Sequence, residues 1–109
     1  MNNMQKMMKQ AQKMAAEMQK AQEQLAEIEV EGSAGGGAVK VVATGDQHIV
    51  SVVIDPDSFD GAPDADDIEM LGDTVTAAVN DALEKSRAMQ AETLGPLAGG
   101  MGGLGLPGL

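Results

Sequence analysis

Four lysines near the start of the chain have the residue type and spacing to bind a polyanion. Lys6, Lys13 and Lys20 are seven residues apart, and Lys9 lies beside this series, so all four would share one side of a helix. We call these four residues the lysine stripe. Residues 1–20 carry four lysines and one glutamate, a charge of +3, although the whole chain carries −10. A local cationic surface of this kind attracts phosphate even on an acidic protein.

The stripe has a simpler alternative interpretation, which is that it solvates the outer face of a coiled coil. No aromatic side chain accompanies it, since Phe59 is the only aromatic residue of the chain. Stacking on single-stranded bases is therefore excluded as a mechanism at the stripe, and duplex phosphates are the nucleic-acid ligand that lysines alone can bind. Lys85 and Arg87, late in the chain, are two further candidate phosphate contacts.

The remaining reactive residues form no recognisable catalytic or metal site. His48 is the only histidine and there is no cysteine, so a zinc site lacks its usual ligands. The glycines from Gly32 to Gly37 lack the lysine of a phosphate-binding loop. The run that starts at Asp55 matches a calcium loop at two ligand positions only. The sequence predicts no enzyme activity, no metal, no cofactor and no small-molecule substrate.

The lysine stripe lies in a segment with a strong helical pattern. Apolar residues recur at alternating steps of three and four across positions 4–28, the pattern of a helix–helix seam. The residues expected to pack this helix are Met4, Met7, Ala11, Met14, Met18, Leu25 and Ile28. At 1.5 Å per residue the helix would span about 37 Å, which suggests an arm that packs on a partner.

The pattern then changes to three short strands. Residues 28–33, 38–44 and 48–54 are separated by Gly-rich or Gly-Asp turns, which predicts an antiparallel meander. Val41, Val50 and Val52 are expected to pack, either within the sheet or against a second copy of the chain. A second helix follows, with Asp64, Asp66 and Asp67 at its start as capping residues.

The fold class is therefore α+β, in the order α-β-β-β-α, as one domain over residues 1–94. Residues 95–109 contain seven glycines and two prolines, which predicts a disordered tail. A small aliphatic core favours oligomerisation. No segment is apolar enough to span a membrane and the N-terminus has no secretory h-region, so we expect no membrane contact and a cytoplasmic location.

Several motifs in the right order resemble the YbaB/EbfC family of bacterial nucleoid-associated proteins. They are MMKQAQKM, VEGSAGGGAVKV at the first hairpin, IDP after the third strand and EMLGDTVTAAVNDALEK in the last helix. The match covers roughly residues 4–94. It implies a homodimer whose sheets join and whose paired helices project like tweezers, with duplex DNA as the ligand, the bacterial chromosome as the location and no enzymatic activity.

These observations together predict a cytoplasmic, homodimeric, nucleoid-associated protein that contacts duplex DNA mainly through phosphates, with weak sequence preference. The alternative is an acidic protein-interaction module that does not touch DNA itself, because a methionine-rich seam also suits an adaptable protein surface. Retardation of duplex DNA by the purified protein alone separates the two.

Overall fold

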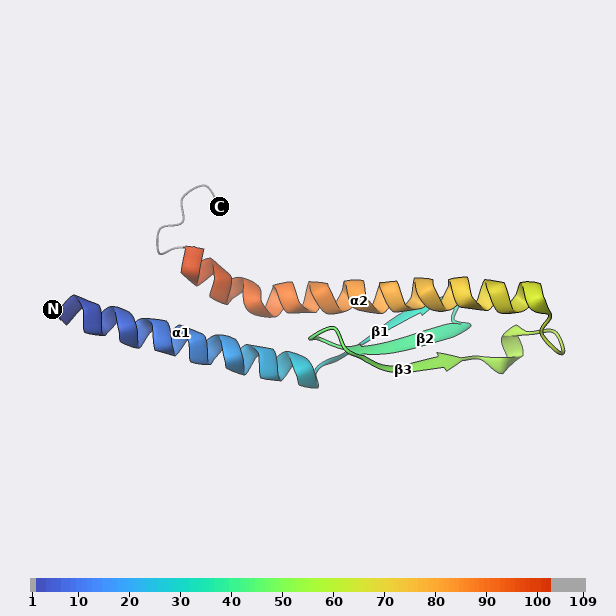
Figure 1. Ribbon diagram of the computed structural model, residues 1–109, viewed down its shortest axis with the longest axis horizontal. Coiled ribbons are helices and arrows are strands. Elements are labelled where there is room, and N and C mark those ends of the chain that lie inside the picture. The colour runs from blue at the N-terminus through green and yellow to red at the C-terminus, as the bar shows by residue number, and fades with distance from the viewer. Residues whose placement is uncertain (1, 103–109) are drawn as a thin grey trace.

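The computed structural model describes residues 2–102, and Figure 1 shows an elongated molecule with extents of 75 × 28 × 18 Å. The elements in chain order are helix α1 (Asn2–Glu27), strands β1 (Glu29–Ala34), β2 (Val39–Thr44) and β3 (Ile49–Ile54), the short 3-10 helix η1 (Pro56–Ser58) and helix α2 (Ala65–Gly102). The α+β class and the predicted order of helices and strands are confirmed.

Helix α1 is packed at one end and exposed at the other. Ala, Met, Gln, Lys and Glu, all good helix formers, supply most of its 26 residues. Near its C-terminus Ala21 and Leu25 are buried, with Leu25 only 1% exposed. Met4 and Met7, near the N-terminus, are 72% and 68% exposed. The predicted apolar seam is therefore covered in the second half of the helix only, and α1 projects beyond the sheet as an arm (Figure 1).

The three strands form an antiparallel sheet in the order β1-β2-β3, as the meander prediction required. Gly35, Gly36 and Gly37 all have positive φ in the β1–β2 turn, which confirms this segment as a hairpin turn. A register shift between Val42 and Ala43 bends the β2–β3 pairing. Helix α2 lies on one face of the sheet, against β1 and β2.

Helix α2 starts with a reciprocal cap and runs beyond the predicted domain end. The Asp67 amide donates to Asp64 Oδ1 at 2.8 Å, and the Asp64 amide donates to Asp67 Oδ2 at 3.0 Å. The helix continues through Pro96 to Gly102, where glycine content predicted disorder, and half-buried Leu94 and Leu97 extend its apolar face past Gly95. Proline removes a helical hydrogen bond, and the last turns bend away in Figure 1. The rest of the predicted tail, 103–109, lies outside the described residues.

The core depends on a close approach between α2 and β1. Its buried residues are Val39, Val41, Ala43, Ala78 and Ala82. Gly32 faces α2 so closely that a Cβ atom on it would lie 2.3 Å from the Ala82 amide nitrogen and 2.7 Å from the Ala78 carbonyl oxygen. Only glycine on the strand and alanine on the helix let the two backbones meet at this distance.

The β2–β3 turn joins α1, the sheet and α2. The buried Ser86 hydroxyl of α2 donates to the Thr44 carbonyl at 2.7 Å and accepts from the Gln47 amide at 3.0 Å. The Gly45 amide donates to the Leu25 and Ile28 carbonyls at 2.9 and 2.8 Å, which satisfies carbonyl groups left free at the end of α1. This turn therefore sets where the arm begins and in which direction it leaves the sheet.

A second polar contact holds α2 on β1. Asp81 accepts from the Ser33 backbone amide at 3.0 Å and lies 3.2 Å from Lys85 Nζ, and Lys85 also donates to the Glu31 carbonyl at 3.1 Å. The amide of Ser33, followed by the Lys85 ammonium, lowers the pKa of Asp81 below its usual value. The carboxylate form is therefore the one that this contact stabilises.

We expect Gly32→Ala to destabilise the fold by about 3 kcal/mol or more, because a new Cβ would force the backbones of β1 and α2 apart. The matched control is Gly72→Ala, where, in contrast to Gly32, nothing lies within 4 Å of a new Cβ atom, and alanine in a helix is more stable than glycine by about 0.5–1 kcal/mol. Urea denaturation of both variants measures the difference. Equal stability of the two would contradict the close approach.

We expect Asp81→Asn to lower the melting temperature at pH 7 and to have less effect at pH 3. The folded-state pKa of Asp81 is depressed, so its contribution is present above the usual aspartate pKa of about 3.9 and is lost as the pH falls through the folded value. Thermal melts of both proteins between pH 7 and pH 3 test this. A constant gap across the range would show that the ionised carboxylate is not what matters.

Candidate nucleic-acid interface

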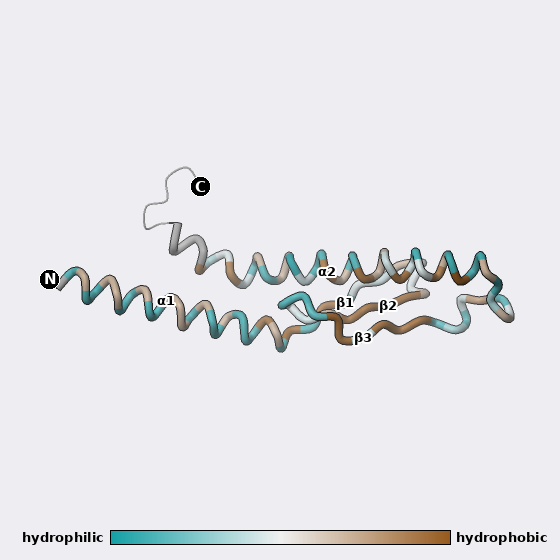
Figure 2. The backbone as a smooth tube through the Cα atoms, viewed as in Figure 1, coloured by the Kyte–Doolittle hydropathy of each residue, from teal (hydrophilic) through white to brown (hydrophobic). Residues whose placement is uncertain are grey.

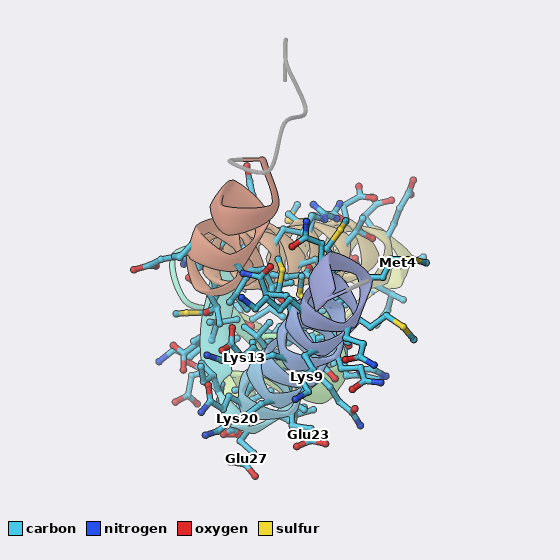
Figure 3. All side chains as sticks on the ribbon, turned by 90° about the vertical axis from the view of Figure 1, so that its left-hand side faces the viewer. Met4, Lys9, Lys13, Lys20, Glu23 and Glu27 are labelled. Carbon is cyan, nitrogen blue, oxygen red and sulfur yellow. The ribbon has the colours of Figure 1, made fainter. Side chains whose placement is uncertain are left out.

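The structure places the whole lysine stripe on the exposed surface of α1. Lys6, Lys9, Lys13 and Lys20 are all exposed. Lys6, Lys9 and Lys13 line one shallow depression together with Gln10, which puts them on a common side of the helix. In Figure 3, Lys9, Lys13 and Lys20 follow one another along α1, whereas Met4 projects from another side. The four lysines therefore lie together along one side of α1, as their spacing in the sequence predicts.

The arrangement of the lysines concentrates positive potential near the tip of the arm. Lys9 lies three residues from Lys6 and four from Lys13, so both pairs are neighbours on the helix surface. Like charges at these spacings destabilise a helix by about 0.2–0.5 kcal/mol per pair, a cost that a merely solvating face would avoid. The first turn of α1 has no acidic residue, so the positive end of the helix dipole adds to the same potential.

The lysine stripe is long enough to contact several phosphates of a DNA duplex. Lys6 and Lys20 are fourteen residues apart, or about 21 Å along the axis. Duplex DNA carries one negative charge per about 1.7 Å of its axis, so a helix lying along the backbone would meet several phosphates. Beyond the stripe, Glu23 and Glu27 follow at the base of the arm (Figure 3), which limits the cationic surface to its outer part.

Lys85 and Arg87 do not extend the stripe as one surface. Lys85 lies over β1, where its ammonium contacts Asp81 and the Glu31 carbonyl. Arg87 is exposed, but residues two apart on a helix do not face the same way. Lys85 therefore has a structural role that its position in the sequence did not indicate, and the two cations do not form a pair.

The residues predicted to pack fall into three groups. Leu25 and Val41 are buried, at 1% and 0% exposure. Met14, Met18 and Ile28 are half-buried, with Ile28 just after the end of α1. Met7, Val50 and Val52 are exposed at 68%, 56% and 42%.

Strand β3 carries an apolar surface that α2 does not cover. Figure 2 shows the hydrophobic colour running along β3 at the edge of the sheet. Its exposed apolar residues are Ile49, Val50, Val52, Val53 and Ile54. Register places Val52 and Ile54 opposite the core residues Val41 and Val39, and Val53 opposite the exposed Lys40, so both faces of the strand are apolar. The continuous apolar run of this strand in the sequence indicates a strand whose two faces are both buried, and this is the pattern from which the surface could have been predicted.

The polar groups of the β2–β3 turn are structural. Asp46 hydrogen-bonds the Thr44 hydroxyl and lies 3.2 Å from His48 Nδ1. The Thr44 hydroxyl is the main cause that lowers the pKa of Asp46, and His48 adds to it. Within residues 2–102, no three acidic or histidine side chains gather as a metal site. Neither helix has, in its described part, a stretch long and apolar enough to cross a bilayer.

The chain is similar to known proteins over nearly its whole length. Residues 1–101 match the YbaB/EbfC DNA-binding family. The chain is 51% identical over 107 residues to a nucleoid-associated protein of Streptomyces avermitilis, covering 98% of this chain and 91% of that protein. It is 53% identical over 107 residues to a nucleoid-associated protein of Desulforamulus reducens, covering 98% and 95%.

The fold also has a counterpart among solved structures. The crystal structure of an uncharacterized protein from Helicobacter pylori superposes with a TM-score of 0.60 at 21% identity, covering 75% of this chain and 90% of that chain. The family match confirms the resemblance seen in the sequence motifs and the prediction of a DNA-binding protein rather than an enzyme. With its lysine-bearing arm, three-stranded meander and long second helix, the chain belongs to the YbaB/EbfC DNA-binding family.

Proposed function

We propose that this protein binds duplex DNA as a homodimer, through phosphate contacts made by Lys6, Lys9, Lys13 and Lys20. The single observation that carries the proposal is the isolation of the lysine stripe on a projecting helix, while residues 21–109 carry three basic and sixteen acidic residues. Lysine positions a protein on the DNA backbone but reads no base edges, so sequence preference is weak.

The acidic body favours contact by the arm alone. A polyanion repels the body and attracts the arm, so the protein would approach the duplex with the tip of α1 foremost. Arg87 is a further candidate for phosphate contact, because its side chain is exposed. We assign Lys85 to the packing of α2 on β1. The relatives are named as nucleoid-associated proteins, and the same location, on the chromosome in the cytoplasm, is our proposal for this chain.

The homodimer is supported by β3. This strand is at the edge of the sheet, and five of its six residues are exposed and apolar, a combination that invites pairing with another chain. Two copies joined by a two-fold axis through β3 would cover this surface and join the sheets. The two arms would then present eight lysines to one duplex, in a tweezer-like arrangement.

For DNA binding, we expect Lys13→Gln to weaken affinity and to make the salt dependence shallower. Each phosphate contact adds about −0.9 to the slope of log affinity against log salt concentration. The slope of the variant should therefore be less negative by about 0.9 for each arm that contacts the DNA. Lys40→Gln is the matched control, since it removes the same charge from an exposed position on β2, away from the arm. Gel retardation of a labelled duplex over a salt series measures both.

Changing all four lysines of the stripe to Gln should abolish most of the salt-dependent binding, while circular dichroism should show that α1 remains helical. Equal slopes for Lys13→Gln and Lys40→Gln would move the DNA surface away from the arm. Failure of the wild-type protein to retard DNA at low salt would favour the protein-interaction alternative.

For the dimer, we expect Val52→Asp to raise the dissociation constant by roughly a hundredfold or more, because an unpaired carboxylate in an apolar interface costs several kcal/mol. Asn80→Asp is the control, with a similar change of charge on the exposed side of α2. Sedimentation equilibrium of the wild type and both variants gives the dissociation constants. A monomeric wild type, or a Val52→Asp variant that dimerises normally, would overturn the β3 interface.

A further inference from the structure

The two ends of the molecule carry opposite charge. The arm holds the lysine stripe at one end, whereas the loop after β3 and the first turns of α2 form the other end (Figure 1). Every charged residue from Asp55 to Asp73 is acidic, and there are eight of them. With a long axis of 75 Å, this gives the protein a positive tip and a negative end. Charge alone defines no site, but the acidic end also contains an apolar groove.

The groove has a volume of about 220 Å³ and lies between the β1–β2 turn, the loop after η1 and the start of α2. Its lining is mostly apolar and includes Ala38, Val39, Phe59, Met70, Leu71 and Thr74. Met70 at the groove is 66% exposed, and Ile68 beside it on α2 is 53% exposed. Asp67 contributes a carboxylate to the wall. The groove therefore offers apolar side chains within the acidic end of the molecule, which suits an amphipathic basic helix.

The tip of α1 has this chemistry. Met4, Met7 and Met8 are 72%, 68% and 63% exposed, and they have the i, i+3, i+4 spacing of helix residues that anchor in a groove. Methionine is unbranched and flexible, so it fills irregular apolar space well. Lys6 and Lys9 lie on the opposite side of the helix, so the methionine side can enter a groove while the lysines keep the arm positively charged.

We propose that the α1 tip of one copy docks in the acidic-end groove of a second copy, with its methionines against the apolar side chains of the groove and its positive charge attracted by the acidic residues of that end. The two surfaces lie at opposite ends of the chain, so a chain cannot fill its own groove. The contact joins unlike surfaces and therefore propagates from copy to copy instead of closing at a pair. It is distinct from the β3 interface and builds assemblies larger than the homodimer.

The absence of cysteine from the chain allows a direct test by disulfide trapping. One preparation carries Met8→Cys, which leaves Met4 and Met7 in place, and a second preparation of different mass, made with a tag, carries Met70→Cys. The two are mixed without DNA under mild oxidation, and the mixed disulfide is quantified on a non-reducing gel. Thr76→Cys replaces Met70→Cys in the control, because Thr76 is also exposed on α2 but does not line the groove.

We expect the Met8→Cys and Met70→Cys pair to form several-fold more mixed disulfide than the control pair. The excess should fall at high salt and when Lys6 and Lys9 are changed to Gln, and it should persist when Val52→Asp is added to both preparations. A yield no greater than the control, or an excess that Val52→Asp removes, would overturn the docking proposal.

A second measurement uses no cysteine. It uses a variant in which the three exposed residues Met4, Met7 and Met8 are all changed to Gln. Sedimentation velocity at high protein concentration should then no longer show assemblies larger than the homodimer, while the homodimer itself should remain. A wild type with no species beyond the dimer would also overturn the proposal. Since neither experiment contains DNA, both outcomes are independent of whether the arm binds the duplex.

Discussion

The backbone contact between α2 and β1 at Gly32 is the constraint on which the rest of the structure depends. It brings Ala78 and Ala82 directly against the sheet and buries Val39 and Val41 beneath the helix. A single helix held this closely over β1 and β2 leaves the apolar residues of β3 exposed. The exposed apolar surface of β3 is thus a consequence of how the core is built, and it is the surface that most needs a partner.

The arm depends on the same core through the β2–β3 turn. Ser86 fixes this turn to α2, and the Gly45 amide holds the end of α1 through the Leu25 carbonyl. Because α1 is held at its C-terminal end only, its outer half has lysines and methionines on its surface and little packing. A projecting helix of this kind can meet a ligand larger than the domain itself without any cleft in the body.

Charge separation along the molecule links these features to function. The acidic body opposes close contact with phosphate, whereas the lysine stripe attracts it, so affinity for DNA is confined to one element and remains sensitive to salt. The same separation makes the two ends of the chain complementary to each other. A protein built this way meets both the duplex and its own neighbours through α1, whose lysines and methionines occupy different sides of one helix.

The sequence by itself determined the features that depend on local pattern: the helix that carries the lysines, the three strands to within one residue at each end, the Asp64–Asp67 cap and the common side of Lys6, Lys13 and Lys20. These follow from periodicity and turn chemistry within short segments. Tertiary structure alone decided that Lys85 contacts β1, that Ser86 holds the distant β2–β3 turn, and that α1 is buried at one end and free at the other. The reason is that these contacts join residues twenty or more positions apart. Their distances depend on how the helices lie against the sheet, a property of the whole packed chain that no local pattern specifies.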